Sequence, residues 1–211
     1  MEKTIIIISG SPGTGKSHIA HAILKELRGF TILSYDEIKE KNFDLFGFDN
    51  VDQKAELNRF GLEEFYLQLG SLMRRRQNLL IEYPFFQRHR DRLLELVVRY
   101  GYRALTLYLY GAPQVIYRRE CLRDKNGIRH PGHLVNCYHK GEPVAGQGGN
   151  YGAVPTYEDY VKMLGQRDYN VGIGQTVSVD VTDIEHVSCG SIVTQIMNCL
   201  KPETNIEGIE E

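Results

Sequence analysis

The chain has 211 residues, of which 42% are hydrophobic, so it is long enough to bury the core of a single domain. Its formal net charge of −2 excludes a general attraction to nucleic acid, although a local basic groove stays open as an alternative. The first residues lead straight into a short apolar strand, so we expect no signal peptide, no membrane anchor and a cytoplasmic location. In that compartment the four cysteines are expected to be free thiols.

The first expected strand, residues 4–9, runs into a glycine-rich segment. Gly10–Ser17 has the spacing G-x-x-x-x-G-K-[ST] of a phosphate-binding loop, or Walker A motif, and a helical pattern follows it. In this context the loop amides and the positive end of the helix surround a polyphosphate, Lys16 reaches the β- and γ-phosphates, and Ser17 can ligate Mg²⁺. The sequence therefore predicts a nucleoside triphosphate held by Gly10, Ser11, Pro12, Gly13, Thr14, Gly15, Lys16 and Ser17.

The second expected strand, residues 30–34, is followed by two acidic side chains. Asp36 lies just after the strand, where ligands bind in a parallel sheet, and a carboxylate there can accept the proton of an attacking hydroxyl. The alternative is that Asp36 only caps the helix that follows, and Glu37 competes for either role. Apolar residues at helical spacing then cover residues 52–76.

The third expected strand, residues 78–82, ends in Glu82, at the position of a Walker-B-like carboxylate. Because phosphate-loop ATPases more often carry aspartate there, we expect Glu82 to contact Mg²⁺ through a water or to orient the acceptor. The alternative is an ordinary exposed strand end. A helical pattern follows over residues 85–100, and Arg88 and Arg90 near its start either contact an acceptor or belong to a solvated face.

The fourth expected strand, residues 104–110, leads into a helix over residues 113–123 that begins with a proline. Arg119 and Arg123 lie one helical turn apart on the same face, where they can act as lid arginines on the transferring phosphate. One arginine on the γ-phosphate contributes roughly 10³–10⁵ in rate. The alternative is a solvent-exposed helix in which these arginines pair with neighbouring acids.

Residues 125–175 interrupt the pattern with many glycines, and only residues 156–164 look helical, with Thr156 as the N-cap. We expect a binding loop or lid there, because a long irregular segment in a compact domain is usually functional or disordered. Four potential zinc ligands fall within it: His130, His133, Cys137 and His139. Their spacing matches no usual zinc site, so a histidine near the acceptor is the preferred interpretation.

The last expected strand, residues 176–181, precedes a helical pattern over residues 184–200. Thr182 and Asp183 between them either line a nucleotide base pocket or cap that helix. Strands and helices thus alternate along the chain, which predicts an α/β fold with a parallel sheet and helices on both faces. Ligands then bind at the carboxyl ends of the strands.

The chain resembles the small P-loop kinases, a group that includes zeta-toxin-like kinases, polynucleotide 5′-hydroxyl kinases, chloramphenicol phosphotransferase and gluconate or shikimate kinases. The resemblance rests on Gly10–Ser17, Asp36, the region of Arg119, Arg123 and Arg129, and the final Val179–Thr182 strand. It implies a three-layer P-loop NTPase fold with a five-stranded sheet of order 2-3-1-4-5, an ATP–Mg²⁺ donor, and Asp36 as the base. Polynucleotide kinases commonly place an arginine three positions after the acid, whereas this chain has Lys39, which lacks the bidentate fork.

We expect one domain over residues 1–211, with an acceptor-side helical region at about 37–76 and a lid at about 118–175. The leading hypothesis is an ATP-dependent kinase that phosphorylates a hydroxyl of a small molecule. A polynucleotide or nucleotide-sugar kinase is the alternative, but the balanced charge does not favour a nucleic acid acceptor. A regulatory NTPase is a third hypothesis. It lacks support because the chain has no Asn-Lys-x-Asp motif, and Glu82 is followed by Tyr83 rather than by a second acid. The oligomeric state stays open.

Overall fold

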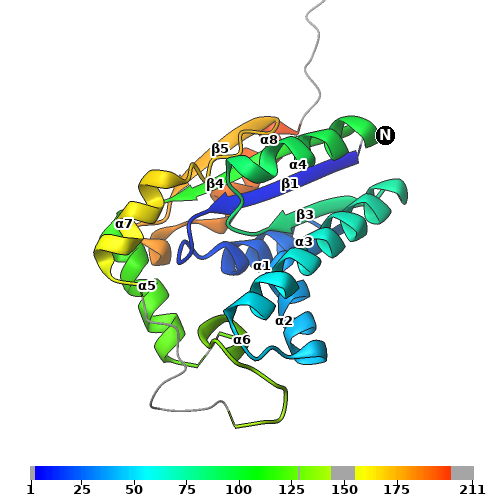
Figure 1. The fold of residues 1–211 in the computed structure, drawn as a ribbon. Coiled ribbons are helices and arrows are strands. Elements are labelled where there is room, and N and C mark those ends of the chain that lie inside the picture. Colours follow the sequence, from blue (N-terminus) through cyan, green and yellow to red (C-terminus); the bar gives the residue numbers. More distant parts are fainter. Residues whose placement is uncertain (1–2, 128, 144–154, 201–211) are drawn as a thin grey trace, which may run out of the picture.

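The computed structural model describes residues 3–127, 129–143 and 155–200, which form a three-layer α/β domain (Figure 1). Its sheet contains five parallel strands in the order β2-β3-β1-β4-β5. They are β1 (Lys3–Gly10), β2 (Phe30–Ser34), β3 (Asn78–Glu82), β4 (Tyr102–Tyr110) and β5 (Gln175–Asp180). This order confirms the predicted P-loop NTPase fold, in which the strand order reverses next to the first strand.

The central strand β1 separates two hydrophobic cores. Ile5 and Ile7 pack with residues of one core, while Ile6 and Ile8 pack with residues of the other, and all four side chains are fully buried. This division follows from the two-residue period of a strand, which sends successive side chains to opposite faces of the sheet. A strand that is buried on both faces reads as a continuous apolar run, as residues 4–8 do.

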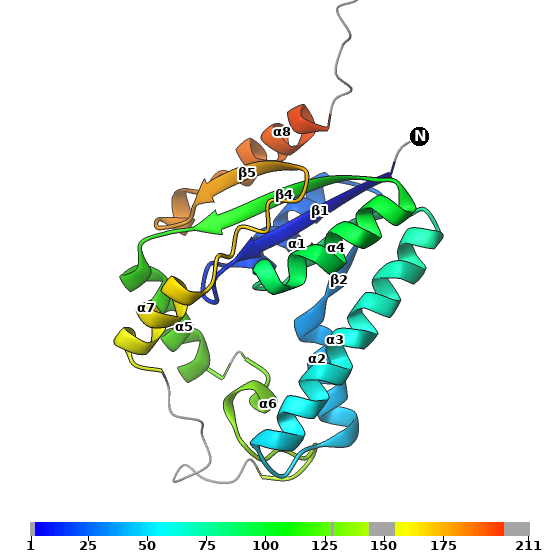
Figure 2. The same ribbon diagram turned by 45° about the horizontal axis from the view of Figure 1, so that its top comes forward.

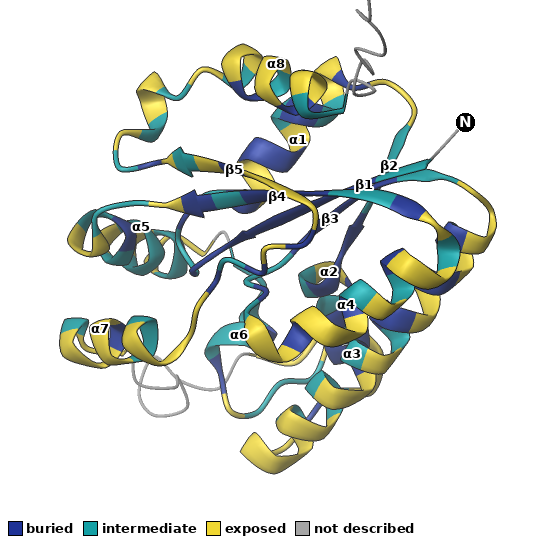
Figure 3. Cartoon of the chain, turned by 90° about the horizontal axis from the view of Figure 1, so that it is seen from above, coloured by how far each residue is buried: buried dark blue, intermediate teal, exposed yellow. Residues whose placement is uncertain are grey.

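Helices cover both faces of the sheet (Figure 3). α1 (Lys16–Glu26) and α8 (Cys189–Cys199) lie on one face, and α3 (Val51–Arg74) and α4 (Gln87–Tyr100) lie on the other. The remaining helices lie toward the carboxyl ends of the strands, as Figures 1 and 2 show. These are α2 (Tyr35–Phe46), α5 (Pro113–Lys125), α6 (Pro131–Leu134), α7 (Tyr157–Gln166) and the short 3₁₀ helix η1 (Ile184–His186). The sheet therefore leaves its carboxyl edge to the loops and helices that carry function.

The observed elements follow the predicted ones closely except after β5. β2 and β3 have the predicted bounds, and Thr156 caps α7 as predicted, with its hydroxyl accepting from the Asp159 amide at 3.1 Å. The helix expected over 184–200 is instead divided into η1 and α8. Ser188 caps α8 and accepts from the Ser191 amide at 3.2 Å, so the alternative in which Thr182 or Asp183 caps this helix does not hold, and Asp183 instead occupies the N-cap position of η1 without a side-chain cap bond.

A segment that we call the strap, residues 130–140, packs along α2. An antiparallel bridge between Phe48 and Tyr138 connects the strap to the loop after α2. A small hydrophobic core of Phe43, Phe48 and Val135 connects it to α2 itself. Lys54 of α3 donates to the carbonyl oxygens of His133 at 3.0 Å and Val135 at 2.8 Å. This part of the predicted irregular region is therefore held in place by packing, while residues 144–154 of the predicted lid lie outside the described residues.

Candidate active site

The phosphate-binding loop connects the end of β1 to the start of α1, as predicted. All three glycines of the turn have positive φ, and at Gly10 and Gly13 a Cβ atom would also meet a backbone carbonyl oxygen. At Gly13, φ is +86° and a Cβ atom would lie 2.6 Å from the carbonyl oxygen of Ile116. At Gly15, the left-handed N-cap of α1, a Cβ atom would lie 2.5 Å from the side chain of Ile184. The loop can therefore follow this path, with its amides beside the N-terminus of α1, only without side chains at these positions.

Lys16 is the buried cation at the base of the loop. Its ammonium group donates to the carbonyl oxygens of Gly10 at 3.0 Å and Ser11 at 2.9 Å. Burial lowers the pKa of Lys16 to about 8, while the nearby carboxylates of Glu82 and Asp36 oppose the shift. Lys16 is thus mainly protonated at neutral pH and faces two acids across the cleft.

Glu82 is buried at the end of β3, only 4% exposed, so the prediction of an ordinary exposed strand end does not hold for it. Burial raises the pKa of Glu82, and the hydroxyl of Ser34, the charge of Lys16 and the hydroxyl of Ser17 oppose the rise. The Ser34 hydroxyl donates to a Glu82 carboxylate oxygen at 2.6 Å. Ser17 and Glu82 together offer oxygen donors, the kind that Mg²⁺ takes in proteins, so these residues fit the predicted metal.

Ser34 resolves the competing interpretations of Asp36. Ser34 is the N-cap of α2, and its hydroxyl accepts from the Glu37 amide at 3.4 Å. Asp36 therefore lies in the first turn rather than at the cap, and its carboxylate is free to face the cleft. The sequence analysis did not single out Ser34, although a serine three residues before a glutamate at a helix start, here Ser34 and Glu37, is a capping-box signal.

Asp36 is ionised and held by Lys39. The two charges lie 2.6 Å apart, and the Lys39 ammonium also sits 4.9 Å and 5.0 Å from the ring centres of Tyr35 and Tyr83. Burial would raise the pKa of Asp36, but the charge of Lys39, helped by His133, lowers it to about 2. Such a carboxylate orients a hydroxyl and accepts its proton late, which suits a loose phosphoryl-transfer transition state.

The arginines at and after α5 reach the same cleft but differ in their partners. Arg119 donates to the carbonyl oxygens of Val181 and Thr182, the second at 2.7 Å. Arg123 lies 2.9 Å from the Asp124 carboxylate, and Arg129 lies 3.3 Å from the same group. Arg123 thus has the acidic neighbour that the alternative interpretation predicted, and it still lines the cleft.

These groups surround one cleft of about 630 Å³. Its walls come from the phosphate loop, the start of α2, the end of β3, α5 and the segment before β5. Several of its residues had no assigned role from the sequence, among them Tyr83, Phe86, Arg167 and Tyr169. Arg88, left open by the sequence, also lines this cleft.

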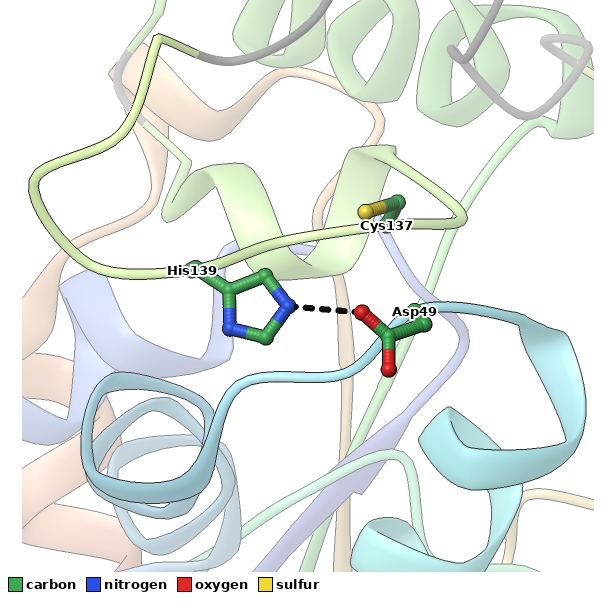
Figure 4. Close-up of side chains that lie close together, drawn as sticks. All are labelled: Asp49, Cys137 and His139. Atoms are coloured by element: carbon green, nitrogen blue, oxygen red, sulfur yellow. Dashed lines mark hydrogen bonds and ion pairs between the residues drawn. The ribbon is translucent and has the colours of Figure 1, made fainter.

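The four potential zinc ligands of the strap do not converge. His130 and His133 each pair with a carboxylate of α2, Asp44 and Glu40, at 3.0 Å. His139 pairs with Asp49 at 2.9 Å, and Cys137 lies near this pair, with all three ligand atoms within 4.8 Å of one another (Figure 4). No fourth histidine, cysteine or acid joins this group among the described residues. Among these histidines His133 is the one whose positive charge, when it is protonated, lowers the pKa of Asp36, while burial lowers the pKa of His133 itself.

The comparisons with known proteins agree with this geometry. A family model described as an AAA domain, AAA_33, matches residues 5–134, which include the phosphate loop, Asp36, Glu82 and the α5 arginines. The chain belongs to this family. No curated protein sequence is significantly similar to it. Among the described residues, no helix is both long and apolar enough to span a bilayer.

Solved structures share the fold at low sequence identity. A candidate kinase from Chloroflexus aurantiacus has a TM-score of 0.76 and 22% identity, covering 95% of this chain and 100% of its own. Shikimate kinase from Bacteroides thetaiotaomicron has a TM-score of 0.57 and 16% identity, covering 93% and 98%. A gluconokinase from Sinorhizobium meliloti has a TM-score of 0.53 and 16% identity, covering 93% and 90%. The AAA_33 protein thus has the fold of these small kinases.

Proposed function

We propose that this AAA_33 protein is an ATP-dependent kinase that transfers the γ-phosphoryl group of ATP to a hydroxyl of a small molecule. The observation that carries the proposal is the position of Asp36, an ionised carboxylate that lines the same cleft as Lys16 and Glu82. A carboxylate in this cleft can position either water or an acceptor hydroxyl, and Asp36 adds to the strand-end Glu82 a second acid of the kind that a kinase uses to orient its acceptor.

The donor side of the cleft would hold ATP. The loop amides, the N-terminus of α1 and Lys16 would bind the phosphates. Ser17 would ligate Mg²⁺ and Glu82 would contact it through a water. When bound, the metal neutralises charge on the β- and γ-phosphates. Arg119, with its guanidinium fixed on the carbonyl oxygens of Val181 and Thr182, is suited to the nucleotide side of the cleft.

In the transfer step the acceptor oxygen forms a bond to the γ-phosphorus while its proton passes to a carboxylate oxygen of Asp36. The bond between the γ-phosphorus and the β,γ-bridging oxygen breaks, and its electron pair leaves with ADP. Lys16 and Arg123 stabilise the charge on the transferring group and the leaving oxygen. Lys39 keeps Asp36 ionised and in place until the proton arrives.

The relatives support this proposal through their titles, which name a candidate kinase, a shikimate kinase and a gluconokinase. Because their identity to this chain is low, they support phosphoryl transfer to a small alcohol in general and no particular acceptor. A polynucleotide acceptor and a regulatory NTPase are the competing outcomes of the test.

The test supplies ATP labelled at the γ-phosphate together with pools of sugars, nucleosides, hydroxy acids and 5′-hydroxyl oligonucleotides. We expect label in a small alcohol, and Asp36→Asn should lower that transfer about 10²–10⁴-fold with little change in ATP affinity. Glu37→Gln, in the same helical turn, is the matched control and should transfer normally. Label found only in free phosphate with every pool would refute the kinase proposal, and normal transfer by Asp36→Asn would refute the role of Asp36.

A further inference from the structure

The acceptor side of the cleft carries two arginines without an acidic partner. The guanidinium groups of Arg88 and Arg167 lie 4.7 Å and 5.0 Å from the ring centre of Phe86, and all three residues line the cleft. Neither arginine takes part in any ion pair of the described residues. Two exposed positive charges therefore converge on one aromatic ring, well apart in sequence and uncompensated by a carboxylate.

The other cations of the cleft are satisfied within the protein. Lys39 pairs with Asp36, Arg123 and Arg129 pair with Asp124, and Lys16 donates to loop carbonyl oxygens. Arg88 and Arg167 thus stand out as charges that the chain itself does not neutralise. A nucleotide on the phosphate loop has its own set of cations, so these two are available to another anion.

A buried hydroxyl lies beside them. Tyr169 is 4% exposed and lines the cleft, its hydroxyl makes no hydrogen bond of good geometry among the described residues, and Arg167 lies close enough to oppose the rise that burial causes in its pKa. Its ring lies 6.0 Å from that of Phe86. A buried polar group without a partner costs free energy, so a hydroxyl in this position is best explained by a ligand that accepts its hydrogen bond.

Hydrogen bonds between side chains of α4 and the backbone of residues 168–171 fix this arrangement. The Asp168 amide donates to the side chain of Gln87 at 2.9 Å, and Arg90 donates to the Val171 carbonyl oxygen at 3.1 Å, so the segment with Arg167 and Tyr169 is held against the helix. The first turn of α4 contains no acidic residue, which leaves the positive end of its dipole uncompensated. The charge, the hydroxyl and the dipole all favour an anion.

We propose that Arg88, Arg167 and Tyr169 form a subsite for a phosphate group of the acceptor, so that the substrate is an alcohol that already carries a phosphate. This rests on the proposed kinase function and names its substrate class. A phosphate monoester carries close to two negative charges and three terminal oxygens. It matches two cations and three donor groups, whereas a carboxylate offers one charge and two oxygens. The acceptor would place its phosphate on this subsite and its hydroxyl at Asp36.

The first test measures binding without catalysis. The phosphate loop is filled with a non-hydrolysable ATP analogue and Mg²⁺, and inorganic phosphate is then titrated by calorimetry. We expect a second site, weakened about 10- to 100-fold by Arg88→Gln or Arg167→Gln, because each removes a charge-assisted hydrogen bond. Tyr169→Phe, which keeps the buried ring, should weaken it about 2- to 10-fold. Arg99→Gln, on the exposed far end of the same helix, is the matched control.

Either of two results overturns the subsite: the wild-type protein binds no second phosphate at millimolar concentrations, or the variants bind it like Arg99→Gln. Both arginines are exposed in the cleft, so their variants should fold, and circular dichroism with thermal melting verifies this.

The second test compares matched acceptors: ribose with ribose phosphate, glycerol with glycerol phosphate, and glycerate as the carboxylate analogue. We expect kcat/KM to favour the phosphorylated member, and we expect that preference to collapse in the two arginine variants but not in Arg99→Gln. A preference for the neutral alcohol or for glycerate overturns the phosphate assignment and leaves the kinase proposal standing. If no acceptor of this panel or of the earlier pools is labelled while phosphate binding still depends on both arginines, the kinase proposal fails and the subsite stands.

Discussion

Replacing Ser34 by alanine tests how the start of α2 and the end of β3 are connected. The Ser34 hydroxyl does two things: it caps α2 at the Glu37 amide, and it donates to the buried Glu82 carboxylate at 2.6 Å. Loss of an N-cap costs about 0.5–2 kcal/mol. Loss of a hydrogen bond to a charged group costs about 1.5–3 kcal/mol. Ser34→Ala should therefore lower the free energy of unfolding by about 2–5 kcal/mol.

The pH dependence of the stability loss in Ser34→Ala distinguishes the contribution of the cap from that of the hydrogen bond to Glu82. Burial raises the pKa of Glu82 above its value in the unfolded chain. The folded protein therefore holds that proton to higher pH, and stability falls as pH rises through the interval between the two pKa values. Ser34 reduces this penalty by stabilising the ionised carboxylate. The difference between Ser34→Ala and the wild type should be largest at neutral pH and shrink as the pH falls toward the raised pKa.

Urea unfolding measures the free energy of unfolding of the wild type, Ser34→Ala and Thr156→Ala, at neutral pH and at about pH 5. Thr156 is the matched control because it caps α7 at an exposed site, and the carboxylate that accepts from its hydroxyl, that of Asp159, is exposed rather than buried. Its replacement should cost about 0.5–2 kcal/mol, the loss of an exposed cap. If Ser34→Ala costs no more than Thr156→Ala, or if its cost does not change with pH, the coupling of Ser34 to Glu82 is refuted.

Three further predictions concern the nucleotide side. Gly13→Ala should lose ATP affinity in a fluorescence titration, because its Cβ would lie 2.6 Å from the Ile116 carbonyl oxygen; Gly29→Ala, with nothing near its Cβ, should bind normally. Because burial lowers the pKa of Lys16 to about 8, ATP affinity should fall as the pH rises above 8 and the ammonium group loses its charge, and a flat profile over that range would contradict it. Arg123→Gln should lower kcat about 10³-fold or more with a smaller effect on ATP affinity, whereas Arg118→Gln, on the exposed face of α5, should act like the wild type.

The sequence predicted those parts of the molecule that depend on local pattern. The apolar run of β1, the phosphate loop and the alternation of strands with helices are each readable within about ten residues, and with the resemblance to small kinases they led to the correct sheet order. The strand-end position of Glu82 also follows from pattern, because parallel strands end at one edge of the sheet. Its burial was not predicted, since it depends on the packing of Ser34 from a neighbouring strand.

The parts that the sequence could not supply are contacts between distant segments. Arg167 and Tyr169 come from the segment after α7, yet they meet Phe86 and Arg88 at the start of α4. No periodicity links positions about eighty residues apart. The histidines of the strap are a similar case. They lie within ten residues of one another in the sequence, but each pairs with a different carboxylate in or just after α2: His130 with Asp44, His133 with Glu40 and His139 with Asp49.

The partner of each arginine in the cleft offers a physical basis for assigning its role. Arg119 donates to two backbone carbonyl oxygens just after β5, which carry no charge to be neutralised elsewhere, so we infer a fixed position beside the nucleotide. Arg123 and Arg129 share the Asp124 carboxylate, so each can turn toward an incoming phosphate while the other keeps the acid paired. Arg88 and Arg167 form no ion pair among the described residues, so an anion can bind them without breaking one. The arrangement thus favours a fixed donor site, an exchangeable charge near the transferring group, and a permanently open anion site for the acceptor.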